Sequence, residues 1–351
     1  MKIRCLPILA ALVLTLASAL PAPACTTFCL RNEGRIVFGK NYDWNVGDGM
    51  LVVNKRGVAR TADANGDPRP ARWESKHGSV TFNQYGRDFP SGGINEAGLT
   101  IELMWLEGSR YPAADARPAV DVLQWIQYQL DNHATVAEVL ASEKGLRINS
   151  QTPIHYLVAD RKGQVATVEF LNGRMVAHTG KDLPMAALAN STYAESLTYA
   201  RKQGGDVPAG IGSLNRFARA ARRVGAFEAK GADPVAYAFE TLDQVAQPGY
   251  TQWSIVYEVD RGRVHFRTRD QRKIRSLDLK TVDFSCSTPV RVLDLDADVQ
   301  GDVAKLLVPY TRDLNRELVT ASFRKTPFLA QMPDAELERV ARYPESDVCR
   351  R

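Results

Sequence analysis

The first alternation of polar and apolar residues lies just after residue 24 and predicts a β-hairpin. Two strand-like runs, residues 26–31 and 35–41, flank the turn tripeptide Asn32-Glu33-Gly34, as expected for strands joined by a short loop. Gly163 and Asn172-Gly173 separate later runs of the same kind, and Asn-Gly is a strong hairpin signal. The further predicted strands cover residues 51–55, 79–84, 99–105, 155–160, 165–171, 174–178, 252–258, 263–268 and 273–277.

Apolar residues at helical spacing predict helices between and after these strands. Leu123, Ile126 and Leu130 recur at intervals of three and four within residues 120–130, the period of one helix face. Thr135-x-x-Glu138 has the pattern of a capping box that opens a second, short helix. Further helices are predicted over residues 216–227, 233–245 and 304–318.

The order of these elements indicates the fold class. Strands at the start, helices in the middle and strands again toward the end predict an α+β fold in which a sheet is layered against helices. Residues 204–212 are expected to form a surface loop. Since no repeat, low-complexity tract or linker interrupts residues 25–351, we expect a single domain over that range.

The first 24 residues have the pattern of a secretory signal peptide. Lys2 and Arg4 give a basic start, residues 9–19 an apolar run, and Ala22-Pro23-Ala24 the small-x-small pattern before a cleavage site. After residue 24, no stretch reaches the roughly 18 apolar residues that a membrane span requires. The sequence therefore predicts a secreted or periplasmic protein without a membrane anchor.

The composition excludes several classes of partner. Hydrophobic residues make up 44% and charged residues 24% of the chain, as in ordinary folded proteins. The formal net charge is +5, to which Lys2 and Arg4 contribute, and this is too little to indicate nucleic-acid binding. The histidines are scattered, without metal-binding spacing, and there is no Gly-rich phosphate loop. We therefore expect no metal and no cofactor.

Cleavage after Ala24 would make Cys25 the first residue of the mature chain, with a thiol and a free α-amine on one residue. In model compounds the amine titrates near pH ~8 and the thiol near ~8.5, so the amine can serve as general base for its own thiol. Two other interpretations compete. A lipidated Cys25 would anchor the chain, although Ala22-Pro23-Ala24 lacks the usual large aliphatic residue. Otherwise Cys25 is an ordinary disulfide cysteine.

The remaining cysteines bear on stability. Cys29, Cys286 and Cys349 follow Cys25 in the predicted mature chain, and an oxidising compartment permits disulfides. A bond between Cys286 and Cys349 would staple the C-terminal tail, although spacing alone does not determine the pairing.

Five short motifs occur in the order found in one family of N-terminal nucleophile hydrolases. Through them the sequence resembles the choloylglycine hydrolase and penicillin V acylase family, related to acid-ceramidase-like amidases, and is closer to its Gram-negative penicillin V acylases. The resemblance implies an αββα sandwich. The motifs are Cys25-Thr26-Thr27-Phe28, Gly39-Lys40-Asn41-Tyr42-Asp43-Trp44, Gly93-Ile94-Asn95-Glu96-Ala97-Gly98-Leu99, Ala189-Asn190-Ser191 and Asn215-Arg216-Phe217.

The resemblance also implies a role for each catalytic residue. Cys25 would attack an amide carbonyl while its own amine takes the thiol proton and later returns one to the leaving amine. Asp43 would orient that amine, as an aspartate orients the base in other triads. Asn190 and the backbone N–H of Trp105 would stabilise the oxyanion, and Arg216 would brace Asp43 or the amine.

Three further residues modify this picture. Lys40 stands where the family usually has arginine; it favours the thiolate of Cys25 as any cation would, but it lacks the planar fork of donors of arginine. Trp44 and Trp105 would line a pocket for a phenyl-containing or fatty acyl group.

Together these features predict a cysteine amidohydrolase that cleaves linear amide C–N bonds of small N-acyl compounds of the penicillin V or N-acyl homoserine lactone type. A conjugated bile salt hydrolase and an N-acyl amino acid or ceramide-like amidase remain as alternatives. A non-enzymatic alternative also remains, namely a secreted binding protein or a degenerate homologue. Lys40, at the position where the family usually has arginine, is the residue that points to it. Whether the chain forms a homo-oligomer is left open.

Overall fold

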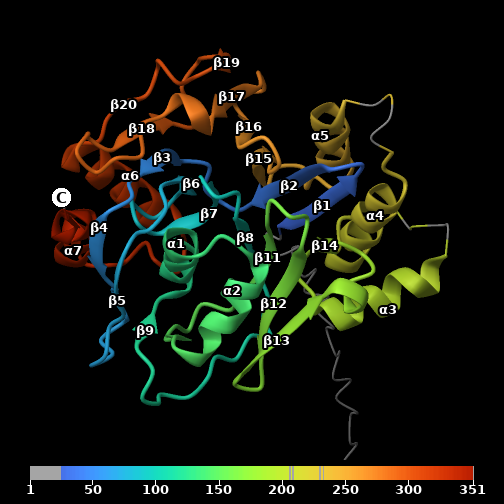
Figure 1. Ribbon diagram of the computed structural model, residues 1–351, viewed down its shortest axis with the longest axis horizontal. Coiled ribbons are helices and arrows are strands. Elements are labelled where there is room, and N and C mark those ends of the chain that lie inside the picture. The colour runs from blue at the N-terminus through green and yellow to red at the C-terminus, as the bar shows by residue number, and fades with distance from the viewer. Residues whose placement is uncertain (1–24, 205–206, 208, 229–230, 232, 351) are drawn as a thin grey trace, which may run out of the picture.

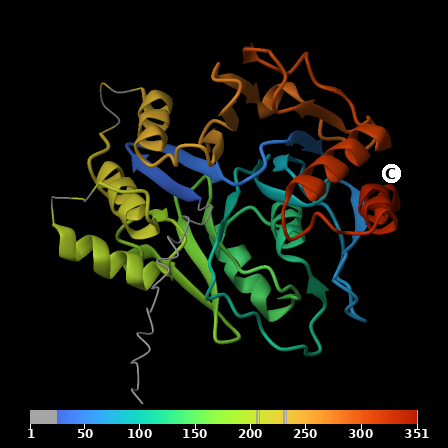
Figure 2. The same cartoon turned by 180° about the vertical axis from the view of Figure 1, so that it is seen from behind.

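The computed structural model describes residues 25–350 except 205–206, 208, 229–230 and 232. The predicted signal peptide, residues 1–24, and part of the predicted loop over residues 204–212 lie outside the described residues. Two large β-sheets pack against each other, and helices lie on their outer sides (Figures 1 and 2). This is the predicted α+β fold, an αββα sandwich, and the prediction is confirmed.

The first sheet carries the N-terminal hairpin near one edge and the later strands beside it. Its seven strands lie in the order β14 (Ala187–Leu188), β1 (Thr26–Asn32), β2 (Arg35–Asp43), β15 (Thr251–Glu258), β16 (Arg263–Thr268), β17 (Arg275–Asp278) and β19 (Gly301–Asp302).

The second sheet is built mainly from the middle of the chain. Its nine strands lie in the order β13 (Arg174–Thr179), β12 (Val165–Leu171), β11 (Ile154–Ala159), β8 (Thr100–Trp105), β7 (Pro90–Asn95), β6 (Ser79–Asn83), β3 (Met50–Asn54), β18 (Arg291–Asp294) and β20 (Val308–Pro309). Two small sheets complete the strands: β9 (Ala119–Val120) with β10 (Arg147–Ile148), and β21 (Val348–Cys349) with β4 (Val58–Thr61) and β5 (Arg72–Glu74).

The helices divide between the two sheets. α4 (Ser213–Gly225) packs on β1 and α5 (Pro234–Gln244) on β2, while α3 (Tyr193–Gln203) lies against α4. On the other sheet, α1 (Val122–Asn132) packs on β7 and α2 (Val136–Ala141) contacts β12. α6 (Arg312–Lys325) and α7 (Asp334–Arg342) pack against each other near the C-terminus. The predicted capping box at Thr135 and Glu138 is present.

The predicted N-terminal hairpin is confirmed, and it brings the first and second motifs together. Glu33 (φ +47°) and Gly34 (φ +78°) both adopt the left-handed conformation that the turn requires. β1 and β2 then pair antiparallel, with Thr26 opposite Asn41 and Thr27 opposite Lys40. The start of β1 therefore lies beside the end of β2.

The predicted helix over residues 304–318 is wrong in its first half. Val308–Pro309 forms the short strand β20, and the helix begins only at Arg312. Thr311 is its N-cap, and the Thr311 side chain accepts a hydrogen bond from the Leu314 N–H. Pro309 has no N–H to donate within a helix. The predicted helix over residues 216–227 begins earlier, at Ser213, so Arg216 lies one turn inside α4.

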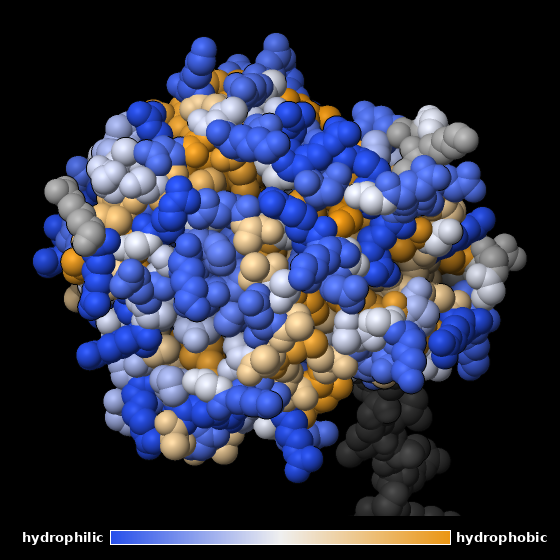
Figure 3. Space-filling model, in the orientation of Figure 1, coloured by the Kyte–Doolittle hydropathy of each residue, from blue (hydrophilic) through white to orange (hydrophobic). Residues whose placement is uncertain are grey.

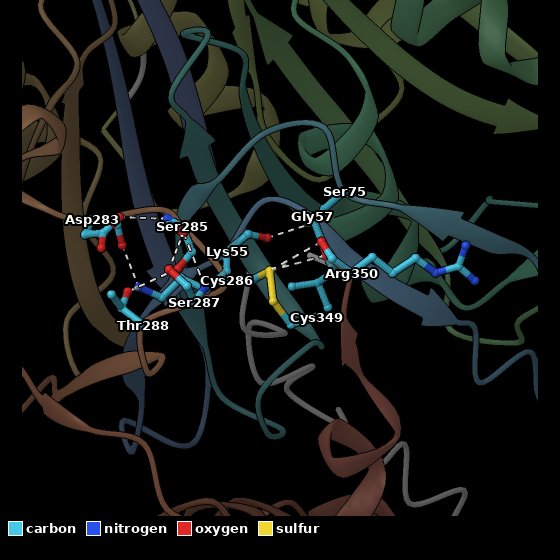
Figure 4. Close-up of a disulfide and its surroundings, with 11 residues drawn as sticks. Lys55, Gly57, Ser75, Asp283, Ser285, Cys286, Ser287, Thr288, Cys349 and Arg350 are labelled. Carbon is cyan, nitrogen blue, oxygen red and sulfur yellow. Dashed lines mark hydrogen bonds between the residues drawn. A yellow bond between two sulfur atoms is a disulfide. The ribbon is translucent and has the colours of Figure 1, made fainter.

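The predicted Cys286–Cys349 disulfide is confirmed (Figure 4), whereas Cys25 and Cys29 are free and buried. Close to the bond, Lys55 donates hydrogen bonds to the Asp283 carbonyl and to Thr288. The disulfide and its neighbours fasten β21, next to the C-terminus, to the segment that precedes β18.

The face seen in Figure 3 is mainly hydrophilic, with apolar residues gathered in several small patches. In the part of the chain that the structure describes, no helix combines the length and apolar character needed to cross a membrane.

Candidate active site

Cys25 lies immediately before β1 and is almost fully buried, with 4% of its surface exposed. Its Sγ is 3.8 Å from the backbone carbonyl oxygen of Asp43, at the end of the partner strand. Burial raises the pKa of the Cys25 thiol, as does the Asp43 charge, while Lys40 and Arg216 lower it. Two buried cations thus offset part of the effect that burial has on the thiolate.

The Asp43 carboxylate is fully buried at the end of β2 and held by three neighbours. Thr251 Oγ1 donates to Oδ1 at 2.5 Å, and Gln247 Nε2 donates to Oδ2 at 2.9 Å. Arg216 Nη1 lies 3.9 Å from Oδ2. Burial raises the pKa of Asp43, and Arg216, Thr251 and Gln247 oppose that rise. The Asp43 carboxylate is therefore fixed in orientation near Cys25, the residue that we expect to begin the mature chain.

Arg216 connects most of the predicted catalytic residues. From α4 its Nη1 donates to the Cys25 carbonyl oxygen at 2.7 Å and to Thr26 Oγ1, and its Nη2 donates to Asn190 Oδ1 at 3.0 Å. The side chain is fully buried. Burial lowers its pKa, and the nearby Asp43 carboxylate opposes that change. The planar, multiply donating guanidinium suits this bridging position.

The Asn190 side chain is held between Arg216 and Trp105. Its Nδ2 donates to the Trp105 carbonyl oxygen at 2.7 Å, and its backbone N–H donates to Ser213 Oγ at 2.9 Å. One N–H of the amide is thus used by Trp105, while the other has no acceptor among the described residues. Asn190 therefore retains one donor for a ligand.

The backbone N–H of Trp105 points away from β11. Leu106 N donates to the Pro153 carbonyl oxygen, and successive N–H groups of a strand alternate between its two edges. On the opposite edge of β8, pairing with β7 ends at Glu102. The Trp105 N–H is thus directed to the edge of β8 that has no strand partner at this position. A backbone N–H in this position could donate to a ligand.

Lys40 lies in the middle of β2 and is fully buried, in contact with an acid that the motifs did not indicate. Its Nζ donates to the Leu103 carbonyl oxygen and is 3.7 Å from Glu102 Oε2. Tyr257 donates to Glu102 Oε1 at 2.6 Å. Burial raises the pKa of Glu102 to about 7, although Lys40 and Tyr257 lower it.

Gly92 leaves the space that this acid occupies. Gly92 is opposite Glu102 in the β7–β8 pair, and a Cβ at this position would lie 2.1 Å from Glu102 Cδ. The only sequence signal for this arrangement was a single acidic residue within the apolar run over residues 99–105.

The Cys25 thiol borders a cavity of about 290 Å³. Trp44 and Trp105, which we expect to bind the acyl group, both border this cavity, with ring centroids 5.9 Å apart. Trp44 Nε1 donates to the Tyr85 hydroxyl at 2.7 Å, and the Phe328 ring meets Trp44 edge-on at 6.3 Å. The wall next to Cys25 is therefore largely aromatic.

The C-terminal part of the chain supplies much of the cavity wall, which sequence reasoning missed. Apolar side chains of the wall come from α6 and the segment after it. Polar side chains of the wall come from α7, from the start of α1 and from the segment between β4 and β5. The apolar residues are Phe323, Phe328, Leu329 and Met332, and the polar ones are Asp63, Asn65, Asp121, Glu336 and Arg339. The cavity thus combines an apolar wall with a charged part remote in sequence from Cys25.

Within the described ranges, no group of three or more His, Cys, Asp or Glu side chains is arranged to hold a metal ion. The chemistry available at the site is that of a thiol, carboxylates, an amide and two cations.

The chain matches the family described as linear amide C–N hydrolases, choloylglycine hydrolase family, over residues 25–225, and it belongs to that family. It is therefore a hydrolase that acts on carbon–nitrogen bonds other than peptide bonds, in linear amides. The family resemblance and the enzyme class predicted from the sequence are both confirmed.

Individual relatives agree with this assignment. A penicillin V acylase from Pectobacterium atrosepticum is 28% identical over 330 residues, which cover 79% of this chain and 86% of that protein. The structure of a penicillin V acylase from Agrobacterium tumefaciens is similar with a TM-score of 0.73 and 28% identity, covering 82% of this chain and 98% of that one. A variant of the conjugated bile acid hydrolase from Clostridium perfringens shares the fold, with a TM-score of 0.66, 17% identity, and coverage of 77% and 97%.

Proposed function

We propose that the chain is a secreted or periplasmic cysteine amidohydrolase in which removal of residues 1–24 makes Cys25 the N-terminal nucleophile. One observation carries the proposal: Arg216 joins Cys25, Thr26 and Asn190 beside the cavity on which the Cys25 thiol opens. Asn190 and Arg216 are remote in sequence from Cys25 and Thr26, and their convergence beside Cys25 supports a catalytic role.

The reaction begins with proton transfer within Cys25. Its α-amine takes the thiol proton, and Sγ attacks the carbonyl carbon of the bound amide. The free N–H of Asn190 and the backbone N–H of Trp105 stabilise the oxyanion that forms. The C–N bond then breaks as the ammonium returns a proton to the leaving amine. Water hydrolyses the resulting thioester, releasing the acid and restoring the thiol.

Asp43 and the two cations support this chemistry from behind the thiol. Asp43 orients the ammonium, and its own orientation is fixed by Thr251 and Gln247. Lys40 and Arg216 favour the thiolate. Since Lys40 is buried against Glu102 and Leu103, it acts as a fixed point charge and contributes no planar donor fork.

The substrate we propose is a small N-acyl amide with an apolar acyl group, such as penicillin V or an N-acyl homoserine lactone. Trp44, Trp105, Tyr85 and Phe328 provide aromatic surface beside Cys25, which suits a phenyl or aliphatic acyl chain. The relatives named penicillin V acylases support the same choice.

The test begins with the N-terminus of the exported protein, which we expect to be an unmodified Cys25. The processed enzyme is then assayed against penicillin V, N-acyl homoserine lactones and a conjugated bile salt. Cys25→Ala should abolish hydrolysis, and Cys25→Ser should leave slow turnover because a hydroxyl is the weaker nucleophile at neutral pH. Near-wild-type activity of Cys25→Ala would refute the proposal, as would a lipidated or differently processed N-terminus.

A further inference from the structure

A buried histidine–glutamate pair lies behind Asn190 and belongs to none of the five motifs. His155 is on β11 and Glu169 on the neighbouring strand β12, and both side chains are fully buried. His155 Nδ1 is 3.3 Å from Glu169 Oε1. Neither residue contacts the cavity beside Cys25. The mechanism described above gives this pair no role.

The other ring nitrogen of His155 contacts the peptide group that precedes Asn190. His155 Nε2 is 2.7 Å from the Ala189 carbonyl oxygen. A carbonyl oxygen can only accept a hydrogen bond, so Nε2 must carry a proton. A further proton is then shared between Nδ1 and Oε1, since neither a bare ring nitrogen nor a carboxylate can donate. The geometry thus fixes the ring orientation through Glu169 and aims Nε2–H at Ala189.

Glu169 also holds the chain beyond Asn190. Its Oε1 accepts a hydrogen bond from the Tyr193 backbone N–H at 2.9 Å, at the first residue of α3. The carbonyl before Asn190 and the N–H three residues after it are therefore both tied to the same buried pair.

We propose that His155 and Glu169 are positioning residues, which hold the Ala189–Asn190 peptide so that the free N–H of Asn190 faces the developing oxyanion. The inference rests on the proposed function, because it assigns the pair to the oxyanion donor of that reaction. A donor of this kind acts only if it is held in place before charge develops, and small displacements cost much of its effect.

The burial of the pair is easier to explain by function than by stability. Removing two ionisable groups from water carries a desolvation penalty that their attraction often fails to offset, and apolar residues of similar size can replace such pairs without loss of stability. The direct contact with Ala189 gives the pair a purpose that an apolar pair could not serve.

A double-mutant cycle tests the proposal on the processed, active enzyme. In the wild-type background, His155→Phe keeps a ring of similar size and should lower kcat at least tenfold while KM changes less than twofold. In an Asn190→Ala background, the same substitution should change kcat less than twofold, because the donor that it positions is gone. Equal losses of kcat in the two backgrounds would overturn the proposal, and so would a raised KM with unchanged kcat.

His178→Phe is the matched control. His178 Nδ1 lies 3.8 Å from the other carboxylate oxygen of Glu169, and its ring packs on Tyr193 at a centroid distance of 4.8 Å. The Ala189 carbonyl is held by His155 and not by His178, so this variant should keep kcat within twofold of wild type. A loss as large as that of His155→Phe would show that the effect does not depend on the hydrogen bond from His155 to Ala189, contrary to the proposal.

A measurement on the unaltered enzyme keeps the proposal testable if His155→Phe does not fold. Nitrogen-15 NMR of labelled histidine should show a proton on Nε2 of His155, and a bare Nε2 would overturn the proposal. Failure of the proposed function gives a different result. If wild type hydrolysed none of the amides, both inferences would fall, whereas an active wild type with additive losses rejects only the role of His155 and Glu169.

Discussion

At the scale of single residues, opposing effects determine the reactivity of the Cys25 thiol. Burial raises its pKa, Lys40 and Arg216 lower it, and Asp43 raises it again. Since the thiolate is the reactive form of a cysteine, the two buried cations oppose the loss of thiolate that burial causes. Lys40 thus supplies a positive charge near the thiol but lacks the planar fork of donors that an arginine would have.

The first prediction concerns Lys40→Met, which removes the buried charge and keeps a flexible side chain of similar length. We expect the pKa of Cys25 to rise, because one of the cations that lower it is lost. At pH 7, alkylation of Cys25 by iodoacetamide should slow on the order of tenfold, as followed by mass spectrometry. As a control for alkylation of Cys29, wild type and Lys40→Met are also compared in a Cys29→Ser background. Cys29 should react little in either case, since burial raises its pKa to about 12. An unchanged pH profile of alkylation would contradict the prediction.

The second prediction concerns the partner of Lys40, Glu102. Burial raises its pKa from 4.5 to about 7, so between these values the folded state holds a proton that the unfolded state has released. The free energy of unfolding contributed by Glu102 is therefore present below pH 4.5 and is lost as the pH rises through 7. Relative to Glu102→Gln, wild type should lose up to about 3 kcal/mol across this window. Urea unfolding at pH 5, 6, 7 and 8 measures the difference, and a constant difference would argue against it.

Candidate site residues that lie in short motifs could be predicted from the sequence, whereas isolated buried polar residues near the site could not. Asp43, Asn190 and Arg216 were found because each belongs to a short local pattern, and the structure brings them to Cys25. Glu102 and His155 are single polar residues within apolar strands. Their partners are 155 residues away for Glu102 and Tyr257 and 34 residues away for His155 and Ala189. Tyr257 lies in the first large sheet and Glu102 in the second, and Ala189 directly follows β14 of the first sheet while His155 lies in the second, so the packing of one sheet on the other determines such pairs.

At the scale of elements, strong patterns were located well, and β7 was missed for a physical reason. The predicted strands over residues 165–171 and 263–268 coincide with β12 and β16. β7 contains Pro90, Gly92 and Gly93, residues that weaken an isolated strand. It forms because β6 and β8 pair with it on both sides, a tertiary effect that local propensity does not contain. α3 had a usable signal, the capping box of Thr192 and Glu195.

The third prediction belongs to α7, which supplies part of the cavity wall. Arg339 pairs with Asp63 at 2.7 Å and with Glu336 at 2.6 Å, and all three border the cavity. Because the pairs are partly exposed, Arg339→Ala should change the free energy of unfolding by no more than about 1 kcal/mol. It should, however, open this part of the wall and shift the preference in kcat/KM toward longer acyl chains by several-fold.

Arg342→Ala is the matched control for this prediction. Arg342 lies one turn further along α7, pairs with Glu345 at 3.7 Å and does not border the cavity. An acyl series of increasing length measures kcat/KM for wild type and both variants. The predicted role of α7 fails if Arg339→Ala and Arg342→Ala give the same chain-length profile.

At the scale of the whole molecule, the C-terminal segment closes the cavity and is itself held at its end. α6 and α7 contribute cavity residues that lie beyond the match to the family over residues 25–225. After α7, Asp347 accepts hydrogen bonds from Arg60 at 2.8 Å and from Arg87 at 3.0 Å. β21 pairs with β4, and Cys349 is bonded to Cys286. The sequence indicated this disulfide but not that it tethers a wall of the site.

The fourth prediction follows from that tether. The disulfide closes a loop with a sequence separation of 63 residues, so replacing both cysteines by serine should lower the free energy of unfolding by about 2–4 kcal/mol. Because only residues 343–347 separate α7 from the tethered strand β21, KM for the preferred amide should rise several-fold while kcat changes little, since Cys25 and Arg216 lie outside the loop. A reducing agent should reproduce both effects in wild type and have none in the double variant. Lower stability with an unchanged KM would mean that Asp347 and the β4–β21 pairing hold the wall by themselves.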